Sequence, residues 1–171
     1  MNAGAHGGEL AQVLEAIDLF DLSECATVTV PAGRAGFAYR SSRLAGTGVV
    51  TRATMRLARG DITAIRARMD EVREWRRIHQ PLAEPNCGSV FKNPRGDHAA
   101  RLIEETGLKG LKIGGASVST KHANFIVASE GARATDVIEL IRSVQERVAA
   151  RHDIHLEPEV RLIGEFDRAP L

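Results

Sequence analysis

The segment 86–94 reads Asn-Cys-Gly-Ser-Val-Phe-Lys-Asn-Pro and brings a thiol, a hydroxyl, an amine and two amides close together. Prolines border it on both sides, so we expect a rigid loop rather than a helix or a long strand. In such a loop Gly88 allows a ligand to approach the backbone, and Ser89 can donate a proton. Lys92 and Asn93 can hold an anionic or carbonyl group. The same residue types also build ordinary turns, so the segment alone leaves an active-site role open.

The composition of the 171-residue chain is that of a globular protein, with 43% hydrophobic and 26% charged residues. A formal net charge of +1 gives no broad attraction to nucleic acid. No apolar run approaches the roughly 18 residues that span a membrane, and we expect neither a membrane helix nor a signal peptide. Cys25 and Cys87 are too few and too far apart for a disulfide framework or a zinc site. We therefore expect a cytoplasmic protein that binds neither nucleic acid nor a membrane.

In the first 60 residues, alternating patterns predict strands at 26–30 and 48–57. Segment 10–20 fits a helix and a strand equally well, and stays open. If the segment around Tyr39 is a strand, Tyr39 and Arg40 point to opposite faces.

Helices and further strands are predicted in the rest of the chain. Asp61 is a plausible N-cap for a helix that runs to about Ile78, with a solvated, salt-bridged face. Asp97 can cap a second helix that ends at Gly107. The remaining predicted elements are short extended pieces within 108–119, a strand at 123–128, a helix from 135 to about 152, and a last strand at 158–164 with Glu159 and Arg161 on one face. This order predicts an α+β chain with a junction near residue 60 or 81.

Seven regions of the chain resemble one family, UDP-N-acetylenolpyruvoylglucosamine reductase, the flavoenzyme that makes UDP-N-acetylmuramate for bacterial peptidoglycan. The resemblance runs from Met1 to about Gly164. The matching stretches are NAGA at 2–5 with GGE at 7–9, Tyr-Arg-x-Ser at 39–42, GSVFKNP at 88–94, LIE at 102–104 with GLKG at 107–110, IGGA at 113–116, KHANFI at 121–126 and LEPEVR at 156–161.

The resemblance implies an FAD- and NADPH-dependent reductase of UDP-N-acetylenolpyruvoylglucosamine. Ser89 would be the general acid that protonates the enol carbon after hydride arrives from the flavin. Arg40 and Glu159 would lie near the substrate carboxylate and stabilise the enolate-like intermediate. This assignment is chemically sensible, because adding hydride to the enol ether places negative charge on its conjugated carboxylate.

Further residues match binding positions of the family. Asn93 matches a substrate contact, and His79 stands where the family usually has a lysine that holds the nucleotide diphosphate. A histidine contact would be weaker and pH-dependent near neutrality. The flavin-side matches are Asn2, Gly4 and Ala5, whose backbone would lie against FAD, and Arg76 and Arg161, close to flavin or substrate.

The resemblance also implies a division of the chain. Residues 1–59 would be the C-terminal half of a PCMH-like FAD-binding domain, 60–80 a connecting helix, 81–164 a substrate-binding domain, and 165–171 a tail. In the family a flavin-binding subdomain precedes the NAGA stretch, with which this chain starts. The alternative function is therefore a non-catalytic UDP-sugar-binding module that needs a separate flavin-binding half. An uncovered sheet edge would favour self-association.

Overall fold

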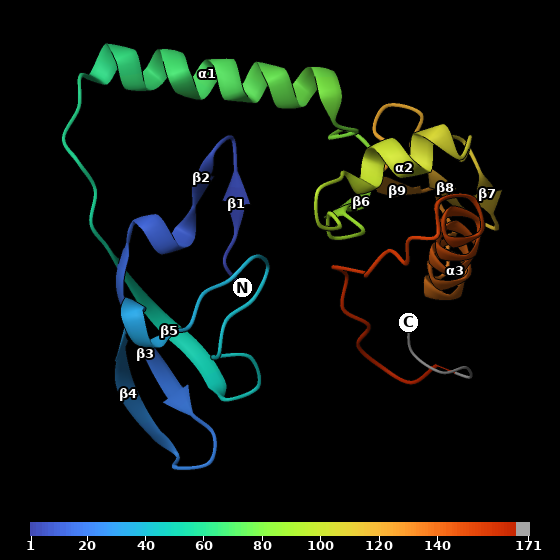
Figure 1. The fold of residues 1–171 in the computed structure, drawn as a ribbon. Helices are drawn as coiled ribbons and strands as arrows, with labels where there is room; N and C mark the ends of the chain where they lie inside the picture. Colours follow the sequence, from blue (N-terminus) through green and yellow to red (C-terminus); the bar gives the residue numbers. More distant parts are fainter. Residues whose placement is uncertain (167–171) are drawn as a thin grey trace. The chain divides into compact units, whose positions relative to one another are not determined.

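The computed structural model describes residues 1–166 and confirms the predicted α+β class (Figure 1). The chain forms two compact units, Met1–Met69 and a second unit that starts at Asp70. The boundary falls inside helix α1 (Ile62–His79). The limits 1–59, 60–80 and 81–164 remain a proposal drawn from the family, and residues 167–171 of the predicted tail lie outside the described part. Within residues 1–166, no helix has the length and apolar character that a membrane span requires.

The first unit is built on a three-stranded antiparallel sheet in the order β4-β3-β5 (Figure 1). Its strands are β3 (Leu14–Asp21), β4 (Ala26–Pro31) and β5 (Gly48–Met55). A short hairpin, β1 (Gly4–Ala5) with β2 (Gly8–Glu9), precedes them, and 3-10 turns occupy Leu10–Gln12 and Ala32–Arg34. The open segment 10–20 is thus a turn followed by a strand.

Tyr39 and Arg40 do not lie in a strand. Ala38 pairs with Ser41, so the two residues between them form a tight turn, with Arg40 at φ 51°. The Arg40 guanidinium stacks over the Tyr39 ring at 5.1 Å from its centroid. Opposite faces were expected only if this segment were a strand, and the turn shows that this condition is not met.

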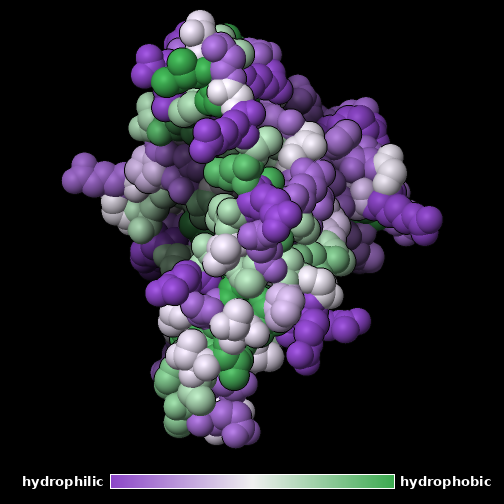
Figure 2. All heavy atoms as spheres, turned by 90° about the vertical axis from the view of Figure 1, so that its left-hand side faces the viewer, coloured by the Kyte–Doolittle hydropathy of each residue, from purple (hydrophilic) through white to green (hydrophobic). Residues whose placement is uncertain are grey.

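Helix α1 begins as predicted, since the backbone N–H of Ala64 donates to Asp61 Oδ1 at 2.9 Å. Exposed ion pairs Arg73–Asp70 and Arg77–Glu74 line its surface. None of its residues is buried, and apolar side chains stand exposed on it and on β5. Figure 2 shows such apolar groups at the surface among charged ones. The large ones on these two elements are Val49, Val50, Met55, Ile62, Ile65, Met69, Trp75 and Ile78.

The second unit has a four-stranded antiparallel sheet in the order β6-β9-β8-β7. Its strands are β6 (Asn86–Ser89), β7 (Lys112–Ile113), β8 (Ala116–Val118) and β9 (Phe125–Ala128). Helices α2 (Ala99–Glu105) and α3 (Ala134–His152) bury apolar side chains in the same core. Members of that core with less than 2% exposure include Val90, Leu102, Ile103, Val118, Leu140, Ile141, Val144 and Val148.

Asp136 joins the start of α3 to the β7–β8 turn. Its carboxylate accepts hydrogen bonds from the backbone N–H groups of Gly115 and Arg133, each at 3.0 Å. These hydrogen bonds, that of Gly115 first, lower the pKa of Asp136. Gly114 has φ +53°, and a Cβ there would lie 2.4 Å from Asp136 Cγ, so the turn requires glycine.

The predicted last strand at 158–164 is absent from the described residues. Pro158 forms only an isolated antiparallel bridge with Phe91. Phe91 and Pro158 form a non-hydrogen-bonded pair, so the hydrogen bonds lie on either side of them and the missing N–H of proline removes neither. Lys92 N donates to Glu157 O at 2.9 Å, and Glu159 N donates to Val90 O at 2.7 Å. The alternation of apolar and charged residues at 158–164 predicted a longer strand and could not show that the pairing is limited to this bridge.

Candidate active site

The loop that carries Ser89 begins as a bulged strand. Asn86 pairs with Val127 and Ser89 with Phe125, so β6 has one residue more than β9 over this stretch. Gly88 has φ +83°, and its N–H donates to Asn86 Oδ1 at 2.9 Å. The bulge changes the direction in which the next side chain points, and Ser89 is exposed on the surface of the unit.

Asn93, the predicted substrate contact, pairs with the first backbone N–H of α2. The backbone N–H of Ala99 donates to Asn93 Oδ1 at 3.1 Å. The prediction that Asp97 caps this helix is therefore wrong. Asp97 lies one residue before the N-cap position, His98, and its carboxylate accepts from the side chain of Arg101, with Nε at 2.7 Å.

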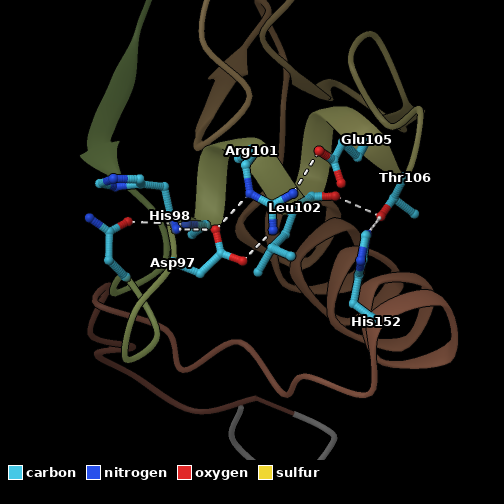
Figure 3. Close-up of polar contacts among 9 residues, drawn as sticks. Asp97, His98, Arg101, Leu102, Glu105, Thr106 and His152 are labelled. Atoms are coloured by element: carbon cyan, nitrogen blue, oxygen red, sulfur yellow. Dashed lines mark hydrogen bonds and ion pairs between the residues drawn. The ribbon is translucent and has the colours of Figure 1, made fainter.

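Figure 3 shows the polar network along α2, which supports the end of the loop. Arg101 bridges Asp97 and Glu105, and its hydrogen bond lowers the pKa of Asp97 to about 2. At the far end, the Thr106 hydroxyl donates to Leu102 O at 2.7 Å and meets His152 Nε2 at 3.1 Å. Since that hydroxyl proton is used on a carbonyl, the imidazole nitrogen must be the donor to Thr106.

Two of the three predicted catalytic residues lie on segments that are hydrogen-bonded to each other. Glu159 N donates to Val90 O, directly after Ser89, at 2.7 Å. Two residues away, Lys92 Nζ forms an ion pair with Glu157 on the opposing segment. The predicted hydroxyl and carboxylate thus come from backbone positions held together by this pairing, although 70 residues separate them in the sequence.

Arg40, the third predicted catalytic residue, belongs to the first unit. Its Nη2 donates to Gly4 O at 3.4 Å, which ties the turn at 39–40 to the β1–β2 hairpin. A Cβ placed on Gly4 would meet Glu9 Cγ and Gly8 O at 3.1 Å, so the hairpin is closely packed on that side. Arg40, predicted to be catalytic, is therefore a neighbour of Gly4, predicted to contact the flavin.

Among the predicted flavin contacts, Asn2 has a structural task. Its side chain is 2% exposed; Nδ2 donates to Glu9 Oε2 at 2.7 Å, and Oδ1 accepts from Ala11 N at 3.0 Å. Gly4 is half-buried and Ala5 exposed, so their backbone is open to a ligand in a way that the Asn2 side chain is not. The hairpin thus exposes main-chain atoms, while the Asn2 side chain holds it in shape.

The remaining predicted contacts are the exposed side chains of Arg76, Arg161 and His79. Arg76 Nε donates to Gln80 Oε1 at 3.1 Å, and Arg161 is exposed on the segment after Glu159. His79 stacks on Trp75, with ring centroids 4.4 Å apart, and its Nδ1 lies 2.7 Å from Trp75 O.

The residue that sequence reasoning missed is Asn124. It is 4% exposed, and both of its side-chain groups bind the backbone of Phe91. A polar residue directly before the apolar run of β9 was the available signal. It was not used, because neither composition nor periodicity shows which backbone a buried amide will pair with.

Comparisons with known proteins show which proteins this chain is similar to. The chain is 45% identical over 166 residues to UDP-N-acetylenolpyruvoylglucosamine reductase from Myxococcus xanthus, covering 97% of this chain and 53% of the relative. The corresponding protein of Enterococcus faecalis is 44% identical, with coverages of 96% and 55%. It is a homologue of these reductases.

Domain and structure comparisons agree with this family. Residues 80–163 match the model of the UDP-N-acetylenolpyruvoylglucosamine reductase C-terminal domain. The crystal structure of the reductase from Thermus caldophilus superposes with a TM-score of 0.83 at 43% identity, covering 94% of this chain and 57% of that one. The chain spans about half the length of the curated relatives it matches.

Proposed function

We propose that this chain reduces UDP-N-acetylenolpyruvoylglucosamine to UDP-N-acetylmuramate for peptidoglycan synthesis in the cytoplasm, with NADPH as reductant and FAD as cofactor. Homology to the reductases supports the reaction. The structural observation that carries the proposal is the hydrogen bond from Glu159 N to Val90 O. It holds the segment of the proposed carboxylate against the loop of the proposed proton donor.

In the proposed mechanism, Ser89 donates the proton to the enol carbon. FAD, when bound, supplies the hydride that it has taken from NADPH. Arg40 and Glu159 are assigned to the substrate carboxylate. A fixed guanidinium favours the negative charge that develops there, and the Glu159 carboxyl does so in its acid form, as a hydrogen-bond donor. A serine hydroxyl is a poor acid in water, so the step requires that the bound substrate exclude solvent from Ser89.

Binding is assigned to the other residues. Asn93 and His79 contact the substrate, with His79 at its diphosphate. The main chain of Gly4 and Ala5, supported by the Asn2 side chain, lies against the flavin. Arg76 and Arg161 lie close to flavin or substrate, where their charge matches phosphate or carboxylate groups.

The core of the second unit supports a second candidate function. The apolar cluster of residues between Val90 and Leu156 is drawn entirely from that unit, and so is the Ser89 loop. Such a unit can hold a UDP-sugar without a flavin. In this case the chain is a UDP-sugar-binding module whose flavin-binding half is supplied separately.

Calorimetry and turnover separate the two candidates. The full chain is titrated with the UDP-sugar, with and without added FAD, and NADPH consumption is then followed with both present. Substrate-dependent NADPH consumption supports the reductase. Heat of UDP-sugar binding without flavin binding or turnover supports the module. Absence of heat, flavin absorbance and NADPH consumption would contradict both.

A further inference from the structure

Asn124 is a buried amide next to the loop that carries Ser89. It directly precedes β9 and is 4% exposed. Its own N–H donates to His122 Nδ1 at 3.2 Å, and its C=O accepts from Val90 N at 2.9 Å. Burial lowers the pKa of His122, which favours the neutral ring that such an acceptor requires.

The side chain of Asn124 pairs with one residue of the loop in both directions. Phe91 N donates to Asn124 Oδ1 at 2.9 Å, and Asn124 Nδ2 donates to Phe91 O at 2.8 Å. The last regular pair between β6 and β9 is Ser89 with Phe125. The Asn124 side chain thus continues the pairing beyond the end of β6. Together with the bond from Val90 N to Asn124 O, it binds the backbone of the two residues that follow Ser89.

The same short segment is held from its other side. Val90 O accepts from Glu159 N at 2.7 Å, and Phe91 bridges to Pro158. Val90 and Phe91 are themselves 1% and 2% exposed, so they are also fixed by packing. Ser89 is the first exposed residue before this doubly bonded segment. A change at Asn124 therefore acts on Ser89 through the backbone, without any contact to a ligand.

We propose that Asn124 is a positioning residue, which fixes the main chain of residues 89–91 through Phe91 and so orients the Ser89 hydroxyl. The catalytic consequence rests on the proposed function. The positioning itself is a property of the folded chain and is measurable without flavin or substrate. An amide suits this task because it offers a donor and an acceptor side by side in one neutral group.

The first test is hydrogen exchange by NMR on the full chain, in the wild type, Asn124→Asp and Asn124→Ser. Aspartate keeps the size of asparagine but cannot donate to Phe91 O, and serine cannot reach both Phe91 groups. Thr106→Val is the matched control, because it removes a partly buried hydroxyl of the same unit that bonds only at α2 and α3. Exchange at Phe91 N–H and the Ser89 Hα–Hβ couplings are compared among the four proteins.

We expect exchange at Phe91 N–H at least about tenfold faster in both Asn124 variants, with altered Ser89 couplings, since one or two hydrogen bonds are lost. Thr106→Val should lower the thermal midpoint without changing either reading. Unchanged exchange and couplings in the Asn124 variants would overturn the proposal. So would an equal rise of exchange at all core amides or the same changes in Thr106→Val, since either would indicate general destabilisation.

The second test is turnover, where the wild type has it. Asn124→Asp should lower kcat about tenfold to a hundredfold and leave KM for the UDP-sugar within about threefold, because misplacing the proton donor affects the chemical step more than binding. A wild-type kcat in this variant would overturn the catalytic consequence. If the wild type itself has no turnover, the proposed function fails, and the exchange experiment still decides the positioning.

Discussion

The side chain of His79 can donate a hydrogen bond to a phosphate only when it is protonated. Its Nδ1 lies 2.7 Å from Trp75 O, and a carbonyl oxygen only accepts, so the proton is on Nδ1. In the neutral ring Nε2 then carries a lone pair, which repels a phosphate oxygen. Protonation converts Nε2 into a charged donor.

We therefore predict that His79→Lys binds the UDP-sugar about tenfold more tightly than the wild type at neutral pH, the typical worth of one hydrogen bond to a charged group, because the lysine ammonium is always a charged donor there. Calorimetric titration of the two proteins measures the difference. Equal affinity of the two proteins would show that residue 79 does not contact the diphosphate.

At the scale of elements, Asn93 combines a structural and a proposed binding task. Its Oδ1 accepts a hydrogen bond from Ala99 N at the start of α2. Asn93→Ala should lower the free energy of unfolding by about 1 kcal/mol, the usual cost of one lost hydrogen bond, and also weaken UDP-sugar binding. Asn93→Asp keeps the acceptor, so its stability should remain near that of the wild type while binding weakens. Chemical denaturation and calorimetry measure the two effects, and unchanged binding in both variants would refute the substrate contact.

The first turn of α2 should respond to acid through Asp97. Hydrogen bonding by Arg101 lowers the pKa of Asp97 from 3.8 to about 2. Because the pKa of Asp97 is lower in the folded chain than in the unfolded chain, its charge stabilises the fold at every pH above the unfolded-state pKa. This stabilisation is lost as pH falls from about 4 to about 2. Asp97→Asn should lower the thermal midpoint at neutral pH and flatten its decline over that acidic range. A variant with the same midpoint and the same acid profile as the wild type would show that the pair contributes nothing, as many exposed pairs do.

Elements with a strong local pattern could be predicted from the sequence. The apolar stripe of α3 and the Asp61 cap of α1 needed only their own residues, and both are present in the structure. The last strand was wrong because its pairing depends on Phe91, which is distant from Pro158 in the sequence. The Asp97 cap was wrong because the N-cap position of α2 falls on the next residue, His98, and the first N–H of the helix pairs with Asn93.

The candidate site shows the same limit. Residue types and the family motifs selected Ser89 and Glu159, and the structure places their segments in contact. Neither motif indicated that Asn124 binds the Ser89 loop, because its side chain bonds to the backbone of Phe91 and not to another side chain. The sequence shows which side chains are present, but it does not show which backbone groups 33 residues away they will bind.

At the scale of the whole molecule, the exposed apolar surface bears on association. Among the described residues, β4 and β5 each pair on one side only, with β3. On β5, Val49 is 55% exposed and Met55 49% exposed. An open edge with apolar side chains favours pairing with a second chain.

We predict concentration-dependent self-association of the full chain, measurable by sedimentation velocity. Val49→Lys should weaken it, because a charge on the edge opposes strand pairing. Glu24→Gln in the β3–β4 turn serves as the control, since it changes the net charge by the same +1 away from that edge. A wild type that sediments as a monomer at all concentrations would contradict the prediction, as would equal effects of both variants.

The most direct test of the whole account is formation of UDP-N-acetylmuramate by the wild type and by Ser89→Ala, with FAD, NADPH and UDP-N-acetylenolpyruvoylglucosamine present. We predict product in the wild type and a rate at least about a hundredfold lower in Ser89→Ala, the usual contribution of a general acid, with UDP-sugar affinity unchanged. Equal rates in the two proteins would contradict the central claim that Ser89 supplies the proton.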